Sequence, residues 1–115
     1  MIQDIQKEFR GLIIEKYTVR VGVYLTFLKV NIKEGKEYID INPSFKILHY
    51  SDVGDSIIKL KDENTCYVVK KNGEKKKFSY VSISQSQRDD KEFPEKWKDK
   101  WMESTIVLDS VYGRN

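Results

Sequence analysis

The chain has 115 residues, of which 39% are hydrophobic, 12% aromatic and 34% charged, and its formal net charge is +3. This length accommodates a single domain over residues 1–115 and excludes two domains of ordinary size. No apolar run approaches the roughly 20 residues of a membrane-spanning helix, and charges interrupt the opening segment where a signal peptide would be apolar. We therefore expect a soluble globular module. Its localisation stays unknown, because an export signal or anchor that had been removed would leave no trace.

The first predicted element is a short amphipathic helical turn at the N-terminus. Ile2, Ile5 and Phe9 recur at helical spacing with charged residues between them. Gly11 is expected to end this turn.

A β-rich segment follows, from Leu12 to Ile32. Apolar and polar residues alternate from Val19 to Phe27, which predicts a strand, and Gly22 is expected to divide the segment in two by a bend or turn. Beyond Phe27 the apolar positions change phase to Leu28, Val30 and Ile32. This change predicts a bulge or a strand that crosses between two sheet surfaces.

Further short elements are predicted between residues 33 and 64. A polar turn precedes a short strand at residues 38–41, which Pro43 should end. Residues 45–50 fit either a helical turn or a strand, and the sequence does not decide between them. Another strand is expected at residues 56–61, after the turn Asp52-Val53-Gly54-Asp55. Such repeated short strands with regular turn signals predict a mainly β fold, a small antiparallel barrel or sandwich.

The best-specified local structure is a β-hairpin over residues 65–80, because Asn72-Gly73 predicts a two-residue type I′ turn. That register pairs Tyr67 with Phe78. One face then carries an aromatic cluster suited to a core, formed by Tyr67, Val69, Phe78 and Tyr80. The other face carries Cys66 and Val68 near the base of the hairpin.

The basic character of the chain is concentrated in this hairpin. Residues 65–87 hold five lysines and one glutamate, a local charge of +4. These lysines are the candidate contacts for a ligand or a nucleic acid: Lys70, Lys71, Lys75, Lys76 and Lys77. Small β-barrels bind single strands through backbone contacts and aromatic stacking. Lysines also keep exposed hairpins soluble, so a solvated tip is the competing interpretation.

The composition changes past Ile83, at the end of the β module predicted for residues 9–83. Residues 84–92 predict a polar connector, and residues 93–112 a helix and a final strand. Pro94 suits the first position of this helix, which should end near Met102. Its aromatic stripe consists of Phe93, Trp97 and Trp101, the candidate partner interface. A helix of about ten residues is marginal alone, so the tryptophans should dock either on the domain itself or on a partner.

The sequence predicts no catalytic, metal or cofactor site. Gly54-Asp55-Ser56-Ile57 looks like the signature of a serine esterase family, but the single histidine, His49, lies upstream of Ser56. Ser56 would therefore lack the base that activates a nucleophile in that mechanism. One histidine and one cysteine cannot form a usual zinc site. Cys66 has no cysteine partner and lies in an apolar run, so we expect it to be a buried small hydrophobe.

Three segments together resemble a group of small uncharacterised bacterial proteins. They are Gly11-Leu12-Ile13-Ile14-Glu15-Lys16, Val53-Gly54-Asp55-Ser56-Ile57-Ile58-Lys59, and Tyr67-Val68-Val69-Lys70 with Asn72-Gly73. The resemblance covers residues 9–83 and implies a small β domain, often exported or membrane-anchored. It implies no activity and no site residues.

These observations favour a non-enzymatic β module that binds a protein or an extracellular ligand, through the tryptophan helix or an open sheet edge. The alternative is nucleic-acid binding through the basic hairpin. The identity of the ligand or partner and the oligomeric state do not follow from the sequence.

Overall fold

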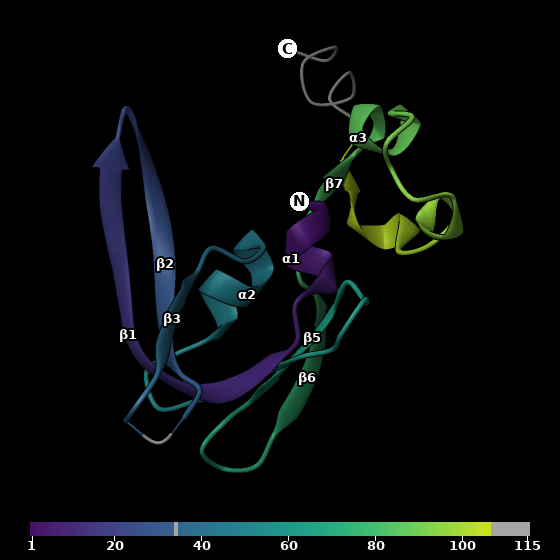
Figure 1. Ribbon diagram of the computed structural model, residues 1–115. Coiled ribbons are helices and arrows are strands. Elements are labelled where there is room, and N and C mark those ends of the chain that lie inside the picture. Colours follow the sequence, from purple (N-terminus) through teal and green to yellow (C-terminus); the bar gives the residue numbers. More distant parts are fainter. Residues whose placement is uncertain (34, 107–115) are drawn as a thin grey trace.

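Six strands form a single antiparallel sheet in the order β3-β2-β1-β4-β5-β6. The computed structural model describes residues 1–33 and 35–106, and Figure 1 shows the sheet curving around helix α2 (Phe45–Tyr50). Its strands are β1 (Phe9–Val21), β2 (Val23–Asn31), β3 (Tyr38–Ile41), β4 (Ser56–Lys59), β5 (Thr65–Val69) and β6 (Lys75–Ser79). The predicted mainly β architecture is confirmed. The sheet is open, with β3 and β6 at its edges, so a barrel or sandwich describes it only loosely.

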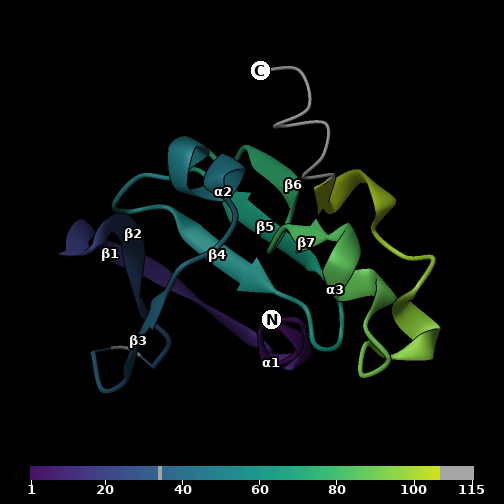
Figure 2. The ribbon, with the colours of Figure 1, turned by 90° about the horizontal axis from the view of Figure 1, so that it is seen from above.

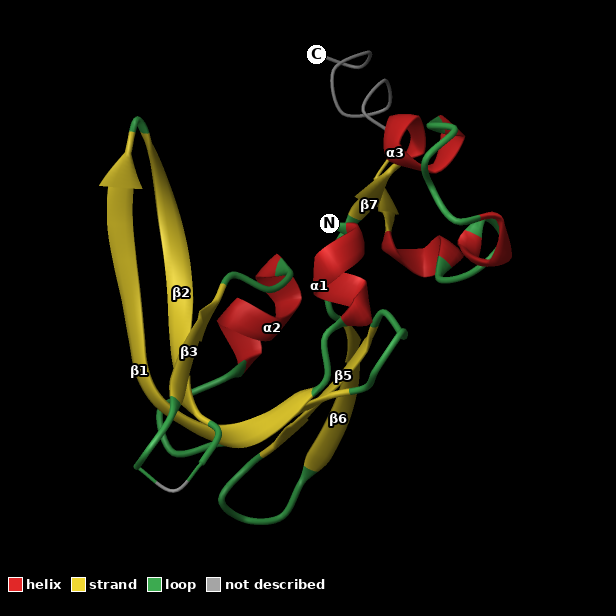
Figure 3. Ribbon diagram, in the orientation of Figure 1, coloured by secondary structure: helices red, strands yellow, loops and turns green. Residues whose placement is uncertain are grey.

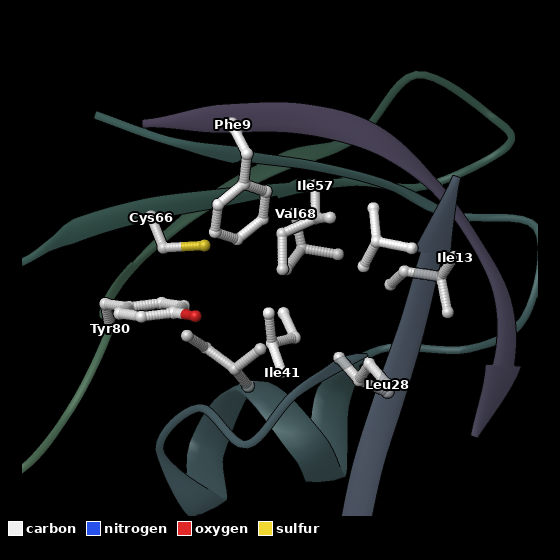
Figure 4. Packing of buried hydrophobic residues seen from close by; sticks show 10 residues of the cluster. Phe9, Ile13, Leu28, Ile41, Ile57, Cys66, Val68 and Tyr80 are labelled. Carbon is white, nitrogen blue, oxygen red and sulfur yellow. The ribbon is translucent and has the colours of Figure 1, made fainter. Parts of the chain in front are cut away.

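The main core lies between the concave face of this sheet and α2. Successive side chains of a strand point to opposite faces, and the inward set meets Ile47 of α2. Figure 4 shows the labelled members of this cluster pointing toward one another. The buried cluster consists of Phe9, Ile13, Leu28, Val30, Ile41, Ile47, Ile57, Cys66, Val68 and Tyr80. Cys66 is therefore the buried small hydrophobe that its apolar surroundings predict.

Strand β1 connects the two halves of the sheet. Its first four residues pair with β4 and the remainder pairs with β2. The prediction that Gly11 ends the N-terminal turn is wrong, because α1 (Ile2–Gln6) ends earlier and Gly11 lies within β1. A Cβ at Gly11 would lie 2.3 Å from the carbonyl oxygen of Asn31. The close approach of β2 therefore requires glycine at this position.

Gly22 separates β1 from β2, as its place in the alternating segment predicts. Its φ of +78° lies in the left-handed region, which glycine adopts without steric cost. The phase change after Phe27 separates two faces of one regular strand: Leu28 and Val30 point into the core, and the odd-numbered residues before them point outward. The register shift of this hairpin lies in β1, between Ile13 and Glu15.

Residues 45–50, for which the sequence left two possibilities, form the helix α2. Ser44 anchors the start of this helix to the end of β6. Its backbone N–H donates to the carbonyl of Tyr80 at 2.6 Å, and its Oγ donates to the carbonyl of Ser79 at 2.8 Å. These bonds hold α2 against the concave face of the sheet, where Ile47 is buried.

The register predicted for the β5–β6 hairpin is wrong by one residue. Cys66, and not Tyr67, pairs with Phe78, and the loop has three residues, Lys71 to Gly73. The N–H of Gly73 donates to the carbonyl of Lys70, and Gly73 has a φ of +93°. This is the loop in which a turn is followed by a glycine bulge. A slip of one residue exchanges the faces of β5, so Cys66 and Val68 are buried and Tyr67 lies on the outer face.

The C-terminal part differs from its prediction in two ways. The expected polar connector contains helix α3 (Gln85–Asp89), which a capping box of Ser84 and Gln87 begins. The expected helix after Pro94 is two 3₁₀ turns, η1 (Glu95–Trp97) and η2 (Met102–Ser104). Of the predicted final strand, only β8 (Thr105–Ile106) lies within the described residues. It pairs in parallel with β7 (Ile83–Ser84).

These C-terminal elements build a second, smaller core with the N-terminal helix. Ile5 of α1 and Ile83 of β7 pack there with Phe93 and Trp97. Figures 2 and 3 show α3, β7 and the C-terminal turns together on one side of the molecule, away from the β1–β2 hairpin. Val81 contacts both clusters and joins them.

Candidate interaction surface

The five candidate lysines do not form one surface. The observed register places Lys70 and Lys76 on the concave side of the sheet, and Lys75 and Lys77 on the outer face. Lys71 lies in the hairpin loop, where its side chain covers Gly54. A ligand that contacts one face of the hairpin therefore meets only part of its positive charge.

Lys70 is engaged within the chain. Its Nζ donates to Oδ2 of Asp55 at 2.7 Å, to Oδ2 of Asp52 at 3.0 Å, and to the carbonyl of Tyr50. Burial opposes the charge of Lys70, but the two carboxylates outweigh it and raise the pKa of this lysine above its ordinary value. Asp55, itself buried, also accepts from the backbone N–H of Asp52 at 2.8 Å. This cluster joins the turn before β4 to the hairpin, so Lys70 has a structural role.

Aromatic rings lie beneath two of the other lysines. The Nζ of Lys75 is 4.5 Å from the centroid of the Tyr67 ring, on the outer face. The Nζ of Lys76 is 5.0 Å from the Tyr50 ring, on the concave side. Both distances fit cation–π contacts. Lys75, Lys77 and the half-buried Tyr67 are the part of the predicted lysine site that lies together on one accessible face.

The aromatic stripe predicted as a partner interface packs on its own chain. Phe93 and Trp97 are 3% and 2% exposed and belong to the second core. Trp101 is half-buried, with its ring centroid 5.6 Å from that of Trp97. Of the two docking sites that the sequence left open, the structure shows the domain itself. Phe93 and Trp97 are thus not accessible to a partner.

A buried arginine that the sequence analysis did not single out fixes the C-terminal turns. Arg88 of α3 donates from Nε to Oγ1 of Thr105 at 2.7 Å and from Nη2 to the carbonyl of Trp101 at 2.8 Å. Trp101 has a φ of +55°, which is a strained backbone conformation for a bulky residue. The capping box at Ser84 was the sequence signal that could have located the helix carrying Arg88.

The hydroxyl groups near His49 are not arranged for nucleophilic catalysis. Oγ of Ser51 is buried and donates to the carbonyl of Ile47 at 2.7 Å. The His49 ring stacks on Phe45 with a centroid distance of 5.9 Å. Ser56 is in β4 beside the buried ion pair of Asp55 with Lys70. The neighbours that suggested a triad or an esterase signature thus have structural contacts of their own.

The outer half of the β1–β2 hairpin projects beyond the rest of the sheet, and we call residues 17–27 the β1–β2 arm (Figure 1). Leu28 points into the core, so alternation places the odd-numbered residues of the arm on its outer face. Their pairing is Tyr17 with Phe27, Val19 with Leu25, and Val21 with Val23. All of these side chains are apolar or aromatic, and none belongs to either hydrophobic cluster of the described residues.

The tip of the arm is its most exposed part. Val21, Val23 and Tyr24 are 70%, 62% and 72% exposed. Hairpin tips normally consist of glycine, asparagine, aspartate and serine, which form turns and stay solvated. The sequence predicted the strands of this arm, but alternation alone does not tell whether an apolar face meets the core or the solvent. The apolar tip was therefore missed.

Both edges of the arm lack a neighbouring strand. Strand β4 pairs with β1 only as far as Leu12, and β3 pairs with β2 only from Leu28 onward. Within the described residues, the backbone between these limits is a two-stranded ribbon. Such a ribbon offers both a face and two edges for contact with another molecule.

Comparison of the chain with models of protein families, with curated proteins and with solved structures gives no match. Among the described residues, no helix has the length and apolar character needed to cross a membrane.

Proposed function

We propose that this protein is a non-enzymatic binding module whose β1–β2 arm contacts another protein. The observation that carries the proposal is the outer face of the arm, which is apolar from its base to its tip and lies outside both cores. Contiguous apolar surface of this kind marks interaction sites in soluble proteins.

The energetics of the arm support this proposal. A two-stranded hairpin without further packing is marginally stable in water. The arm has cross-strand contacts, such as the Tyr17–Phe27 ring pair at 5.6 Å and the Thr18–Thr26 hydroxyl pair at 3.0 Å. Such pairs contribute roughly 0.2–1 kcal/mol each. A partner that covers the outer face would add about 25 cal/mol for each Å² of apolar area removed from water.

Recovery of bound protein from a cell lysate tests the proposal. Serine at both Val21 and Val23 removes apolar area from the tip without changing a core residue. Serine at Val53, a valine that is 48% exposed in the turn before β4, is the matched control. We expect the Val21→Ser/Val23→Ser variant to lose proteins that the wild type and Val53→Ser recover. An identical set of recovered proteins for all three would contradict a role for the arm.

Single-stranded nucleic acid is the second candidate ligand, and the contact of Lys75 with Tyr67 on the outer face favours it. Lys71, Lys75 and Lys77 are exposed, whereas Lys70 is held by two carboxylates. Three phosphate contacts give a slope of log K against log salt near −2 for a single strand, since each contributes about −0.7.

Fluorescence anisotropy with a labelled oligonucleotide at two salt concentrations tests this candidate. Glutamine at Lys75 and Lys77 should remove more than half of the slope. Glutamine at Lys76, which lies on the concave side, is the control and should leave most of it. No saturable binding at low salt would remove nucleic acid from consideration.

A further inference from the structure

The free edges of the sheet differ in how they are protected against pairing. The outer edge of β6 carries Lys75 to Lys77, and the free part of β1 carries Glu15, Lys16 and Arg20. The outer edge strand β3 is only four residues long and includes Asp40. Charges and short length are devices by which natural sheets prevent unwanted strand addition.

The free part of β2 has none of these devices. Residues 23–27 are Val-Tyr-Leu-Thr-Phe, all favourable in strands, with no charge, proline or glycine. The register shift of the hairpin lies in β1, so β2 has no bulge. Short uncharged segments of high β-propensity pair readily with copies of themselves when an edge exposes them.

The orientation of the backbone along this edge follows from one hydrogen bond. The carbonyl of Thr26 accepts from Nδ2 of Asn42, which follows β3, at 2.6 Å and so points away from β1. Residues two apart in a strand direct their backbone groups to the same side, so Tyr24 also points outward. A carbonyl oxygen has two lone pairs, so Thr26 can accept a second bond beside that of Asn42.

We propose that the uncharged edge of β2 pairs with the same edge of a second copy of this chain, antiparallel about a two-fold axis at Leu25. This inference rests on the proposed function, because it names the protein that the arm contacts. The axis places Tyr24 opposite Thr26 of the second copy, and Val23 opposite its Phe27. The outer faces of the two arms then form one continuous apolar surface.

Charge and shape favour a second copy as the occupant of this edge. Residues 23–27 of each chain are uncharged, so no like charges meet across the axis. The charged residues Lys16 and Arg20 are on β1, one strand farther from the axis on each side. An edge of five residues buries well below the roughly 1,200 Å² of a standard interface. The dimer is therefore weak and forms in a concentration-dependent way.

Disulfide crosslinking across the axis tests the inference. Because Tyr24 and Thr26 point toward the second copy, the two Leu25 residues form a non-hydrogen-bonded pair with Cα atoms about 4.5 Å apart. This separation permits a disulfide. The Leu25→Cys variant should form a covalent dimer under mild oxidation. Val19→Cys is the matched control, because Val19 pairs with Leu25 on the same face but lies one strand from the axis.

The wild type should remain uncrosslinked, because Cys66 is buried. Equal crosslinking of Leu25→Cys and Val19→Cys would indicate random collision and overturn the proposed axis. Absence of crosslinking in both variants would overturn it as well.

Sedimentation equilibrium measures the same association without a cysteine. The average mass of the wild type should rise from the 13.6 kDa of the monomer as the concentration increases. Tyr24→Lys adds a charge to the β2 edge and should abolish this rise, whereas Thr18→Lys, on β1, should keep it. A mass of 13.6 kDa at every concentration would overturn the inference. The proposed function would still stand if the Val21→Ser/Val23→Ser variant lost a different protein from the lysate.

Discussion

At the scale of single residues, Lys59 is the least ordinary member of the main fold. Its side chain is 1% exposed, and its Nζ donates to the carbonyls of Ile5, Lys7 and Leu60 at 2.7, 2.9 and 2.6 Å. The Tyr80 ring lies 5.4 Å from the same atom. Lys59 therefore joins the N-terminal segment to β4 by charge-assisted hydrogen bonds. No sequence pattern predicted this role, because lysine in an alternating strand is usually assigned to the solvent face.

Replacement of Lys59 by methionine should destabilise the protein. The three carbonyls would lose their donor, and each buried unsatisfied group costs about 1–3 kcal/mol. We expect a loss of roughly 2–4 kcal/mol in the free energy of unfolding by urea. Lys61→Met, at an exposed position nearby, is the control and should change it by less than about 0.5 kcal/mol. Equal stabilities of the two variants would refute the role of Lys59.

Burial lowers the pKa of Lys59 to about 8 in the folded protein, from an ordinary value of 10.5. Between these values the unfolded chain binds more protons at this site than the folded chain. The stability contributed by this site should therefore rise with pH above about 8 and stay level below it. The difference in unfolding free energy between wild type and Lys59→Met, measured at pH 7.5 and 9, should be larger at pH 9. A constant or smaller difference would show that the carbonyls keep the pKa near its ordinary value.

Cys66 gives a simple chemical test of the core. Burial raises the pKa of its thiol to about 12, so almost no reactive thiolate exists at neutral pH. We expect no reaction with a thiol reagent at pH 8 in the native state and complete reaction in concentrated urea. Rapid native labelling would place Cys66 at the surface and contradict the observed register of β5 and β6.

At the scale of elements, the sequence predicted where strands occur better than how they pair. Alternation and turn residues located the strands of the large sheet, because both signals are local. Asn72-Gly73 was misleading because a two-residue turn and a three-residue loop with a glycine bulge both place glycine at its end. Only the tertiary preference for burying Cys66 and Val68 selects between them. The helix α3 was missed although its capping box is visible in the sequence, because the segment between its caps is polar.

The turn of the β5–β6 hairpin can be tested by two substitutions. In a type I′ turn both Asn72 and Gly73 would need positive φ, whereas in the structure only Gly73 has it. Gly73→Ala should therefore cost about 1–2 kcal/mol of folding stability. Asn72→Ala should cost less than about 1 kcal/mol, for the bond that its Oδ1 accepts from the N–H of Glu74. Large costs at both positions would restore the two-residue turn.

At the scale of the whole molecule, the chain combines a curved sheet around α2, a small C-terminal core and an arm that belongs to neither. The first two account for the buried residues, and their apolar composition made them predictable in outline. The aromatic stripe was expected to serve either the core or a partner, and the structure places Phe93 and Trp97 in the core. The arm reverses this outcome, because an alternating segment of the kind that usually packs inward is left on the outside. Burial depends on the other elements, so sequence pattern alone could not separate the two cases.

The central claim is that the arm serves contact with another molecule and does not stabilise the fold. The most direct test is the free energy of unfolding of a chain in which Asn-Gly replaces residues 20–24, because Val19 and Leu25 direct their backbone groups toward each other and can close a two-residue turn. This change keeps the Thr18–Thr26 pair and the bond from Asn42 to Thr26. The account predicts a value within about 1 kcal/mol of the wild type, since the removed side chains belong to neither core. A loss of several kcal/mol would show that the arm is a structural part of the fold and would contradict the account.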